Sequence, residues 1–467
     1  MNELFIPIDL NGKVHIYQQI YEYIKQAIRE GSLAQGAKLP STRSFAAHLG
    51  VSRSTIELSY DQLLSEGYIE SIPYKGYYVC KVEGMLAIKE KPEGFSDAGK
   101  KEEVCTYDFS PNAVDMTHFP VATWQKISKK VYLDHERDLL SMGDPMGDSS
   151  LRSAICEYLH SFRGVSCDER QIIVGAGNDY LLMLLSMILG SGRKMAVENP
   201  TYQRAYRIFT ESGYEMYPID VDTDGMRVDL LKKSAADTAY IMPSHQFPTG
   251  VIMPIGRRMQ LLEWAYERQE RYIIEDDYDS EFRYRGKPIP ALQGADKNGK
   301  VIYLGTFSKS IAPAFRVSYM VLPKALLAIY EQKCAFLSST VPRVNQEIFA
   351  QFISEGYYER YLNKMRKIYR EKHNLVLREL ASFEQLFTID EHGTGLHVLL
   401  RCKDSKVSEQ DLVARAKLRS CRVYGMRQYH VSEPKEGATI IVGYAALSKE
   451  DIVKGIARLR DAWLDHQ

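Results

Sequence analysis

The segment LGTFSKSIAPAFR, from Leu304 to Arg316, places Lys309 between small hydroxyl residues directly after an apolar run. A lysine is ordinarily a solvated surface charge, so this position needs an explanation from the rest of the chain. Around it, β-prone apolar runs alternate with helical patterns, which predicts an α/β fold with a mainly parallel sheet covered on both faces. Ligands bind where the strands of such a sheet end, so we expect Lys309 to lie at a ligand site.

The composition excludes several classes of protein. The 467 residues carry 60 basic and 60 acidic side chains, a balance that predicts neither a nucleic-acid coat nor a membrane-surface protein. The seven cysteines are scattered without a CxxC pair, which is typical of a reducing compartment and argues against a zinc module. No apolar run reaches the roughly 18 residues that a membrane helix needs. We expect a cytoplasmic protein with no metal centre and no membrane partner.

Periodicity and composition divide the chain into parts. Within residues 1–80, helical patterns begin at Ile16 and after the N-cap candidates Ser41 and Ser52, and a hairpin is predicted around Pro73 to Gly76. Residues 81–105 are rich in Lys, Glu, Gly and Ser and are predicted to be a linker that spans about 25 to 30 Å. Residues 106–467 carry the α/β pattern, and a small C-terminal α+β domain is expected from about residue 340.

Two further strand ends suit a ligand. Gly175 to Asn178 follow a strand and open a helix, where bare amides and the helix dipole favour a phosphate. Glu198 follows at the distance of a dinucleotide fingerprint, but Tyr180 occupies the third glycine position, so a Rossmann dehydrogenase stays an alternative. The second strand end reads Glu275-Asp276-Asp277-Tyr278, and adjacent carboxylates repel one another without a cation. A magnesium site, a solvated loop and a pyridoxal phosphate site are three interpretations.

Pyridoxal phosphate would account for several of these residues together. The cofactor needs a carboxylate beside its protonated ring nitrogen, a phenol beside its ring oxygen and a lysine that forms an imine. Lys309 is the candidate for the imine, and Thr306 and Arg316 are candidates for the phosphate, since arginine offers the planar fork that phosphate prefers. Tyr202 offers an aromatic face for stacking on the ring.

The order and spacing of GDPMGDSSLR, VGAGNDY, ENPTY, PSHQFPTG, IIEDDYDSEF and GTFSKSIAPAFR resemble a fold-type I aminotransferase, as found in the effector domain of MocR/GabR-type bacterial regulators. The resemblance covers nearly the whole chain. It implies that Lys309 forms the Schiff base, that Asp276 pairs with the pyridine nitrogen and that Tyr278 donates to the phenolic oxygen. The other implied cofactor contacts are the phosphate-binding amides of Ala176, Gly177 and Asn178, with Thr306 and Arg316, and the stacking ring of Tyr202.

The sequence differs from the family pattern at the second carboxylate-binding position and at the position of the family's asparagine. Arg204 matches a carboxylate-binding arginine of the γ-aminobutyrate-responsive relatives, but a gapless reading puts Gln428 at the second such position and Arg427 one residue earlier. A shift of one residue in a strand turns a side chain to the other face. His245 and Gln246 stand where ordinary aminotransferases carry an asparagine. We therefore expect Arg204 and Arg427 as effector-binding candidates and little transaminase turnover.

The first 80 residues resemble a GntR-type winged helix-turn-helix, notably KLPSTRSFAAHLGVSRSTIELSYDQLLSEGYIE. A recognition helix from about Ser52 would present its first turn to the major groove, and the hairpin tip would form the wing. The DNA-binding candidates are Arg43, Ser52, Arg53, Ser54, Thr55, Lys75 and Gly76. Each of them would otherwise be an ordinary solvated surface residue, and residues 1–80 show no basic excess.

These features together predict a transcription regulator. Promoter DNA would be read by the winged helix, and an amine, an amino acid or pyridoxal phosphate itself would be sensed through the imine at Lys309. The chain is expected to form a homodimer, in which the linker length permits the N-terminal domains to be exchanged. The alternative is an active pyridoxal phosphate-dependent aminotransferase with an accessory DNA-binding domain.

Overall fold

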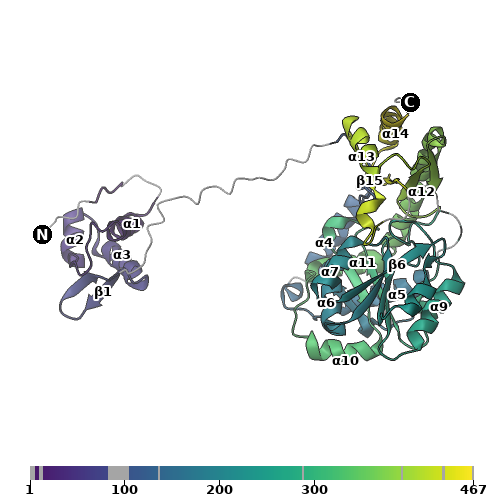
Figure 1. Cartoon of the computed structure of the whole chain (residues 1–467). Helices are drawn as coiled ribbons and strands as arrows, with labels where there is room; N and C mark the ends of the chain where they lie inside the picture. Colours follow the sequence, from purple (N-terminus) through teal and green to yellow (C-terminus); the bar gives the residue numbers. More distant parts are fainter. Residues whose placement is uncertain are drawn as a thin grey trace. The chain divides into compact units, whose positions relative to one another are not determined.

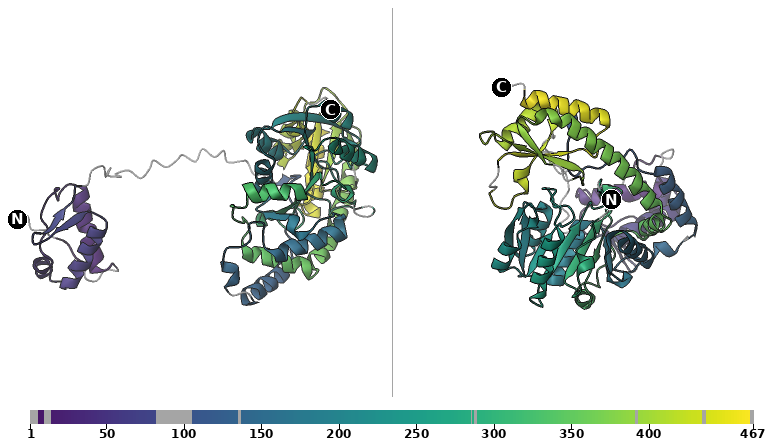
Figure 2. Two further views of the ribbon diagram at one scale, coloured as in Figure 1. Left: turned by 90° about the horizontal axis from the view of Figure 1, so that it is seen from below. Right: turned by 90° about the vertical axis from the view of Figure 1, so that its right-hand side faces the viewer.

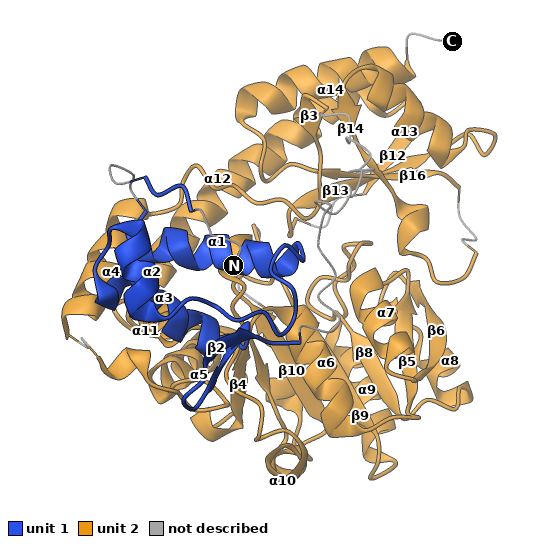
Figure 3. Ribbon diagram, turned by 90° about the vertical axis from the view of Figure 1, so that its left-hand side faces the viewer, with its two compact units in different colours: residues 1–102 blue, residues 103–467 orange. Residues whose placement is uncertain are grey.

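The computed structural model describes residues 6–9, 14–81, 105–134, 137–284, 286, 289–390, 393–433 and 437–464. Residues 1–102 and 103–467 form two compact units (Figures 1 and 3). Nearly all of the expected linker, residues 81–105, lies outside the described residues. Among the described helices, none combines the length and apolarity that crossing a membrane requires.

The first unit is a small helical domain with a two-stranded hairpin. Its helices are α1 (Ile16–Arg29), α2 (Thr42–Leu49) and α3 (Arg53–Ser65), and its strands are β1 (Ile69–Ile72) and β2 (Gly76–Val79). The hydroxyl of Ser41 accepts from the Ser44 amide and that of Ser52 accepts from the Thr55 amide, so both predicted N-caps are confirmed. Gly50 ends α2 in the left-handed region at φ 66°, which a glycine adopts without strain.

The core of this unit lies between the three helices and the hairpin. The apolar residues that recur at helical spacing are buried together, namely Ile20, Ile24, Phe45, Ile56, Tyr60 and Leu63. Strand β1 pairs antiparallel with β2 from Ile69↔Val79 to Ile72↔Gly76. The hairpin tip carries Tyr74, which has a left-handed backbone and a fully exposed side chain. The arrangement is the helix-turn-helix with a wing that the sequence predicts.

The second unit is built on an eight-stranded sheet with the strand order β4-β11-β10-β9-β8-β5-β6-β7. Strand β11 runs antiparallel to both neighbours and β7 runs antiparallel to β6, while the remaining pairs are parallel. The strands are β4 (Ile172–Gly175), β5 (Lys194–Asn199), β6 (Glu215–Asp222), β7 (Gly225–Met226), β8 (Thr238–Ile241), β9 (Tyr272–Asp277), β10 (Val301–Thr306) and β11 (Ser318–Val321). The mainly parallel α/β sheet is therefore confirmed, in a strand order that differs from the Rossmann order.

Helices cover both faces of this sheet because its central strands are apolar on both sides. In β10, Ile302 and Leu304 pack into the cluster that contains α6, α7 and α10, whereas Tyr303 packs into the cluster that contains α4, α5 and α11. The covering helices are α4 (Val121–Asp134), α5 (Ser149–Arg163), α6 (Asn178–Leu189), α7 (Gln203–Glu211), α8 (Val228–Lys233), α9 (Ile255–Tyr266), α10 (Lys324–Lys333) and α11 (Arg343–Ser354).

A smaller domain carries a four-stranded antiparallel sheet in the order β12-β13-β16-β15. Its strands are β12 (Phe387–Asp390), β13 (His397–Cys402), β15 (Tyr424–Gly425) and β16 (Thr439–Gly443), and its helices are α12 (Tyr357–Leu380), α13 (Glu409–Leu418) and α14 (Lys449–Trp463). The right-hand view of Figure 2 shows α12 and α14 over this sheet. Ser448 caps α14, since its hydroxyl accepts from the Asp451 amide.

The boundary of the smaller domain differs from a simple division near residue 340. Helix α11 and the first half of α12 pack into the core of the large domain, and along α12 the buried side chains join the small-domain core only from Val376 onward. Strand β3 (Tyr107–Asp108) pairs with β14 (Cys421–Arg422), so the start of the unit belongs to the same small core. Short 3-10 helices complete the unit at Asp138–Leu140, Glu169–Gln171, Gln293–Ala295, Pro313–Phe315, Ala381–Phe383 and Met426–Tyr429.

Candidate functional site

A pocket at the carboxyl ends of the central strands brings together residues from distant parts of the chain. Its lining residues are Asn112, Asn178, Asp179, Tyr202, Met242, Phe247, Asp276, Tyr278, Thr306, Ser308, Lys309 and Arg316. Most of the cofactor contacts expected from the sequence are in this set. Asn112 and Met242 line the pocket from outside the family motifs, and Asp179, Phe247 and Ser308 line it from within them but were not expected as site residues.

Lys309 enters the pocket from the turn that follows β10. Its Nζ donates to the carbonyl oxygen of Pro111 at 2.9 Å and lies 3.5 Å from Asn112 Oδ1. Burial lowers the pKa of Lys309 to about 8, against the opposing effect of the Asp279 carboxylate. A lysine with a lowered pKa carries an uncharged amine in a larger share of the molecules at neutral pH, and that is the nucleophilic form.

Asp276 is a buried carboxylate on β9, the strand next to β10. It accepts from Asn178 Nδ2 at 2.9 Å and from the Tyr240 hydroxyl. Burial raises the pKa of Asp276 to about 6, although the two hydrogen bonds lower it. A buried carboxylate of this kind is stabilised by a cationic partner, and the protonated ring nitrogen of pyridoxal phosphate is one.

The three consecutive carboxylates of β9 have separate partners. Glu275 accepts from the amides of Leu292 and Gln293, both at 2.8 Å, and Asp277 pairs with Arg163 at 2.8 Å. Side chains alternate across a strand, so Asp276 faces the other side of the sheet. The carboxylates therefore do not converge on one cation, which removes the magnesium interpretation.

Tyr278 and His245 form a buried network that the sequence motifs did not indicate. The Tyr278 hydroxyl lies 2.9 Å from His245 Nδ1, and the same nitrogen lies 2.9 and 3.0 Å from the two carboxylate oxygens of Asp279. Gly395 makes room for the imidazole, because a Cβ there would lie 2.0 Å from His245 Cε1. The only feature of the sequence that pointed to Asp279 is its position in the motif DDYD, two residues after Asp277.

The expected phosphate-binding residues lie around the N-terminus of α6. Gly177 has φ 90°, and a Cβ at this position would lie 2.3 Å from Arg316 Nη2, so only glycine permits this approach. Arg316 Nη2 lies 3.3 Å from Asp179 Oδ2, and Thr306 Oγ1 accepts from the Ser308 amide at 3.1 Å. A guanidinium, a hydroxyl and a helix N-terminus form a donor set that fits a phosphate.

Two of the three expected phosphate-binding amides have protein acceptors in this structure. The Ala176 amide donates to Thr340 Oγ1 at 2.9 Å, and the Gly177 amide donates to the Gly175 carbonyl at 2.7 Å. Asn178 begins α6, where backbone amides lack intrahelical acceptors. Its side-chain Oδ1 is buried and has no partner among the described residues. The residues present therefore fit pyridoxal phosphate at its ring nitrogen and its phosphate.

Tyr202 and the two effector-binding candidates, Arg204 and Arg427, lie at different places relative to the Lys309 pocket. Tyr202 lines the pocket, and burial raises its pKa to about 12. Arg204 is exposed and reaches the pocket mouth by pairing with Asp179 at 3.1 Å. Arg427 is exposed and does not line the pocket, and its backbone amide donates to Glu409 at 3.0 and 3.1 Å. Gln428 donates to the Gly425 carbonyl.

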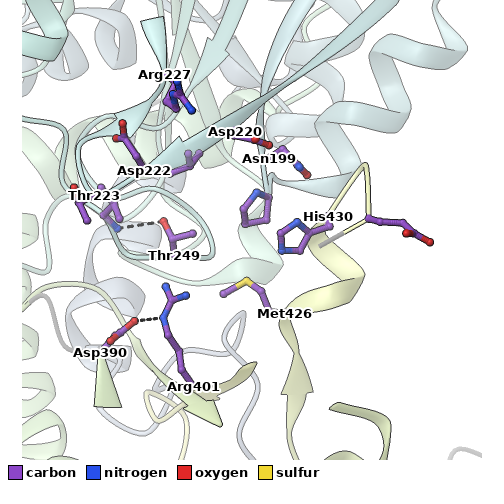
Figure 4. Close-up of a pocket in the computed structure, with 14 residues that line it drawn as sticks. Asn199, Asp220, Asp222, Thr223, Arg227, Thr249, Asp390, Arg401, Met426 and His430 are labelled. Carbon is purple, nitrogen blue, oxygen red and sulfur yellow. Dashed lines mark hydrogen bonds and ion pairs between the residues drawn. The ribbon is translucent and has the colours of Figure 1, made fainter. Parts of the chain in front are cut away.

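A larger cavity lies away from Lys309, between the large and small domains of the second unit. Its volume is about 760 Å³, and Asp222, Thr223 and Arg401 are among its lining residues. Figure 4 shows Met426 and His430 entering this cavity from the small domain. None of the expected site residues lines it.

The candidate DNA-binding residues lie on the surface of the first unit. Arg43, Arg53, Ser54 and Lys75 are exposed. Arg53 Nε pairs with Glu57 Oε1 at 2.8 Å, and Ser52 Oγ lies 2.7 Å from Thr55 Oγ1 as part of the helix cap. Lys38 was not among the predicted DNA-binding residues. Its backbone forms an antiparallel β-bridge with Tyr78 of the wing, and a Cβ at Gly76 would lie 3.6 Å from Lys38 Cε.

Comparison with known families agrees with both units. Residues 16–79 match the model of the bacterial regulatory proteins of the gntR family, and residues 108–459 match that of the class I and II aminotransferases. The chain therefore belongs to the MocR-type transcriptional regulators, in which a GntR helix-turn-helix domain is joined to a fold-type I aminotransferase domain.

Relatives of similar length share this organisation. The chain is 38% identical to the uncharacterized HTH-type transcriptional regulator YdeL of Bacillus subtilis, over 96% of this chain and 97% of the relative. It is 32% identical to the probable rhizopine catabolism regulatory protein MocR of Rhizobium meliloti, over 98% and 96%. Identity to the pyridoxine biosynthesis transcriptional regulator PdxR of Corynebacterium glutamicum is 28%, over 98% of each chain.

Solved structures resemble the second unit. The multiple substrate aminotransferase of Thermococcus profundus superposes with a TM-score of 0.70 at 26% identity, covering 77% of this chain and 92% of that chain. The kynurenine aminotransferase of Pyrococcus horikoshii superposes with a TM-score of 0.69 at 24% identity, covering 77% and 91%. The aminotransferase fold implies pyridoxal phosphate as the cofactor of this site.

Proposed function

We propose that this chain is a pyridoxal phosphate-dependent transcription regulator that senses an amine, an amino acid or the cofactor itself at the Lys309 pocket. The observation that carries the proposal is a lysine with a pKa of about 8 in one pocket with the buried carboxylate of Asp276, in a chain with a GntR-type domain. When bound, pyridoxal phosphate supplies an aldehyde that reacts reversibly with primary amines.

The residues of the pocket have separate roles in this proposal. Lys309 would hold the cofactor covalently, Asp276 would face its ring nitrogen and Tyr278 would donate to its phenolic oxygen. Arg316, Thr306 and the N-terminus of α6, with the amides of Ala176, Gly177 and Asn178, would hold the phosphate, with Tyr202 stacked on the ring. Phosphate binding would then replace the acceptors that the Ala176 and Gly177 amides now have.

Arg204 is the proposed contact for an effector that carries a carboxylate. Its guanidinium shares Asp179 with Arg316 at the pocket mouth, so an added carboxylate would replace a carboxylate already bound there. Arg204→Ala is expected to weaken the response to carboxylated amines more than to simple amines. Arg427→Ala is the matched comparison, because Arg427 is an exposed arginine outside the pocket. Equal effects of the two substitutions would contradict the assignment to Arg204.

Regulation requires that the effector binds two arrangements of the protein with unequal affinity. We propose that the chain acts as a homodimer on promoter DNA, with the DNA-binding domains exchanged between subunits. Residues 1–80 have no basic excess, so two domains on repeated half-sites would supply the affinity that one domain lacks.

The test is a titration of the full-length protein, loaded with pyridoxal phosphate, on a DNA fragment that it selects from genomic DNA. α-Amino acids, ω-amino acids and diamines are added while the visible spectrum of the cofactor and the fluorescence anisotropy of labelled DNA are recorded together. We expect one class of amine to change both signals over the same concentration range. DNA affinity that is unchanged by every amine and by removal of the cofactor would refute the regulator.

The same experiment distinguishes two other functions, a sensor of the cofactor itself and an active aminotransferase. The name of PdxR supports a sensor of the cofactor itself, in which DNA affinity differs between cofactor-free and loaded protein without an amine. The likeness to the multiple substrate aminotransferase supports an active enzyme, in which keto acid accumulates well beyond one equivalent per chain. His245 and Gln246 replace the family's asparagine, and this favours sensing over turnover.

A further inference from the structure

Two cysteines and a histidine meet at the end of α5, outside the Lys309 pocket. Cys156 Sγ lies 3.7 Å from Cys167 Sγ and 3.7 Å from His160 Nε2, and Cys167 Sγ lies 3.9 Å from the same nitrogen. Cys156 and His160 are one helical turn apart, and Cys167 follows the glycine that ends the helix. Among the described residues, this is the group of Cys, His, Asp and Glu whose ligand atoms come close enough to share an ion.

These distances match those between the ligands of a tetrahedral zinc ion. Bonds of about 2.3 Å to sulfur and about 2.0 Å to nitrogen at tetrahedral angles separate two sulfurs by about 3.8 Å and a sulfur from a nitrogen by about 3.5 Å. The three separations differ from these values by a few tenths of an ångström or less. An ion therefore fits between the three ligands with little movement of the backbone.

We propose that Cys156, His160 and Cys167 bind one thiophilic divalent cation, of which Zn²⁺ is the expected member. Thiolate and imidazole are the ligands that zinc prefers, and the fourth position is open to water because His160 is exposed. The nearby carboxylates of Asp168, Glu169 and Glu157 add negative charge that attracts a dication. The spacing C-x3-H-x6-C lacks the CxxC pair of a zinc module, and for that reason the sequence predicted no metal.

Binding has a defined proton balance. Both thiols lose a proton to solvent, and two sulfur–metal bonds and one nitrogen–metal bond form. In the metal-free protein His160 Nε2 donates to the Cys167 carbonyl at 2.8 Å. Metal binding breaks this hydrogen bond, and the ring proton moves to Nδ1 so that Nε2 binds the ion. Two protons are released for each ion bound, and affinity therefore increases with pH.

The site would clip the loop after α5 onto the helix. Arg163, at the end of α5, pairs with the buried carboxylate of Asp277, which is next to Asp276 on β9. A metal ion that fixes the end of α5 would therefore also stabilise the position of β9. Because metal that binds only the folded state stabilises it, a bound ion is expected to raise the melting temperature of the whole second unit.

The test uses full-length protein that is purified with a reductant, loaded with pyridoxal phosphate and stripped of metal with a chelator. Zn²⁺ is titrated in competition with a chromophoric chelator, and Co²⁺ is added in parallel as a spectroscopic probe. We expect one ion per chain, thiolate-to-cobalt charge-transfer bands, tetrahedral d–d bands and an increase in melting temperature. The visible band of the cofactor is expected to stay unchanged.

Variants assign the ion to this cluster. His160→Ala, which changes an exposed side chain, and Cys167→Ser are each expected to weaken Zn²⁺ binding at least about 100-fold, since even outer-shell changes cost 10- to 100-fold. Cys402→Ser is the matched control, because that cysteine lies in the small domain away from the cluster. Absence of stoichiometric binding, or affinities that these substitutions leave unchanged, would overturn the proposal.

Discussion

His245 and Asp279 are joined by a buried hydrogen bond in which Nδ1 lies 2.9 and 3.0 Å from the two carboxylate oxygens. An ionised carboxylate only accepts hydrogen bonds, so Nδ1 carries the ring proton and has no lone pair for the neighbouring Tyr278 hydroxyl. That hydroxyl, 2.9 Å from the same nitrogen, keeps its own proton for another acceptor in the pocket. This is the role that the sequence predicts for Tyr278 toward the cofactor's phenolic oxygen.

His245→Phe is expected to destabilise the protein by about 1.5 to 3 kcal/mol, because a hydrogen bond to a charged group is lost and the Asp279 carboxylate stays buried. Asp279 is only 3% exposed, so water does not replace the donor. Denaturant unfolding measures the change. In the Asp279→Asn background the same substitution is expected to cost clearly less. Equal costs in both backgrounds would show that the two side chains are not coupled.

Lys309→Ala is expected to abolish the visible absorption band of the lysine-bound cofactor while the fold is kept. Lys309 lies in a turn after β10, and its substitution removes only the hydrogen bonds to the Pro111 carbonyl and Asn112 Oδ1. Absorption spectroscopy measures the band, and borohydride reduction followed by mass spectrometry locates the linked lysine. Lys324→Ala, an exposed lysine at the start of α10, is the control. A band that persists in Lys309→Ala would refute the site.

Arg53→Ala is expected to weaken promoter binding by about 1 to 3 kcal/mol for each arginine that contacts DNA, without a change in the cofactor band. Arg53 is exposed at the first position of α3. Arg29→Ala, at the other end of the domain's helices on α1, provides the comparison. Anisotropy titrations at several salt concentrations measure the loss. If both variants bind equally well, α3 does not approach the DNA as proposed.

Glu57→Gln tests the same helix in the opposite direction. In the free protein Glu57 pairs with Arg53 at 2.8 Å, and this pair must open before the arginine reaches a phosphate. Removal of the charge is expected to tighten DNA binding by less than about 1 kcal/mol, the usual value of an exposed ion pair. The gain is expected to disappear in the Arg53→Ala background, and a gain that persists there would point to general charge repulsion instead.

Buried carboxylates give the second unit a stability that falls as the pH rises. Burial raises the pKa of Glu198 to about 8 and that of Glu275 to about 7. Between the ordinary pKa of about 4.3 and these values, the folded protein keeps protons that the unfolded chain has lost. Each such proton lowers the free energy of unfolding by about 1.4 kcal/mol per pH unit across that window.

Glu198→Gln separates this contribution, because it replaces a protonated carboxyl by a neutral side chain of similar shape. Chemical unfolding is measured between about pH 5 and pH 8 for both proteins. The variant is expected to lose stability less steeply as the pH rises. Parallel curves for the two proteins would mean that Glu198 is ionised in the folded state.

Local patterns and family motifs were enough to predict much of the fold and most of the residues that line the Lys309 pocket. The caps Ser41 and Ser52 and the buried runs of β9 and β10 follow from short-range rules of hydrogen bonding and periodicity. The family motifs then indicated which strand ends carry Lys309 and Asp276. Strand order was not predictable in this way, because β11 pairs antiparallel both with the preceding strand β10 and with β4, which is distant in sequence.

The sequence by itself therefore determined the family, the two-unit organisation and the residue types at the Lys309 pocket, since these depend on contiguous motifs. Only the tertiary structure decided which side chains meet. It brought Asp279 to His245 and Cys156 to Cys167 and His160, and it turned Arg427 away from the pocket. Such contacts depend on the direction in which a side chain leaves its element and on the packing of neighbours, and neither is contained in spacing along the chain.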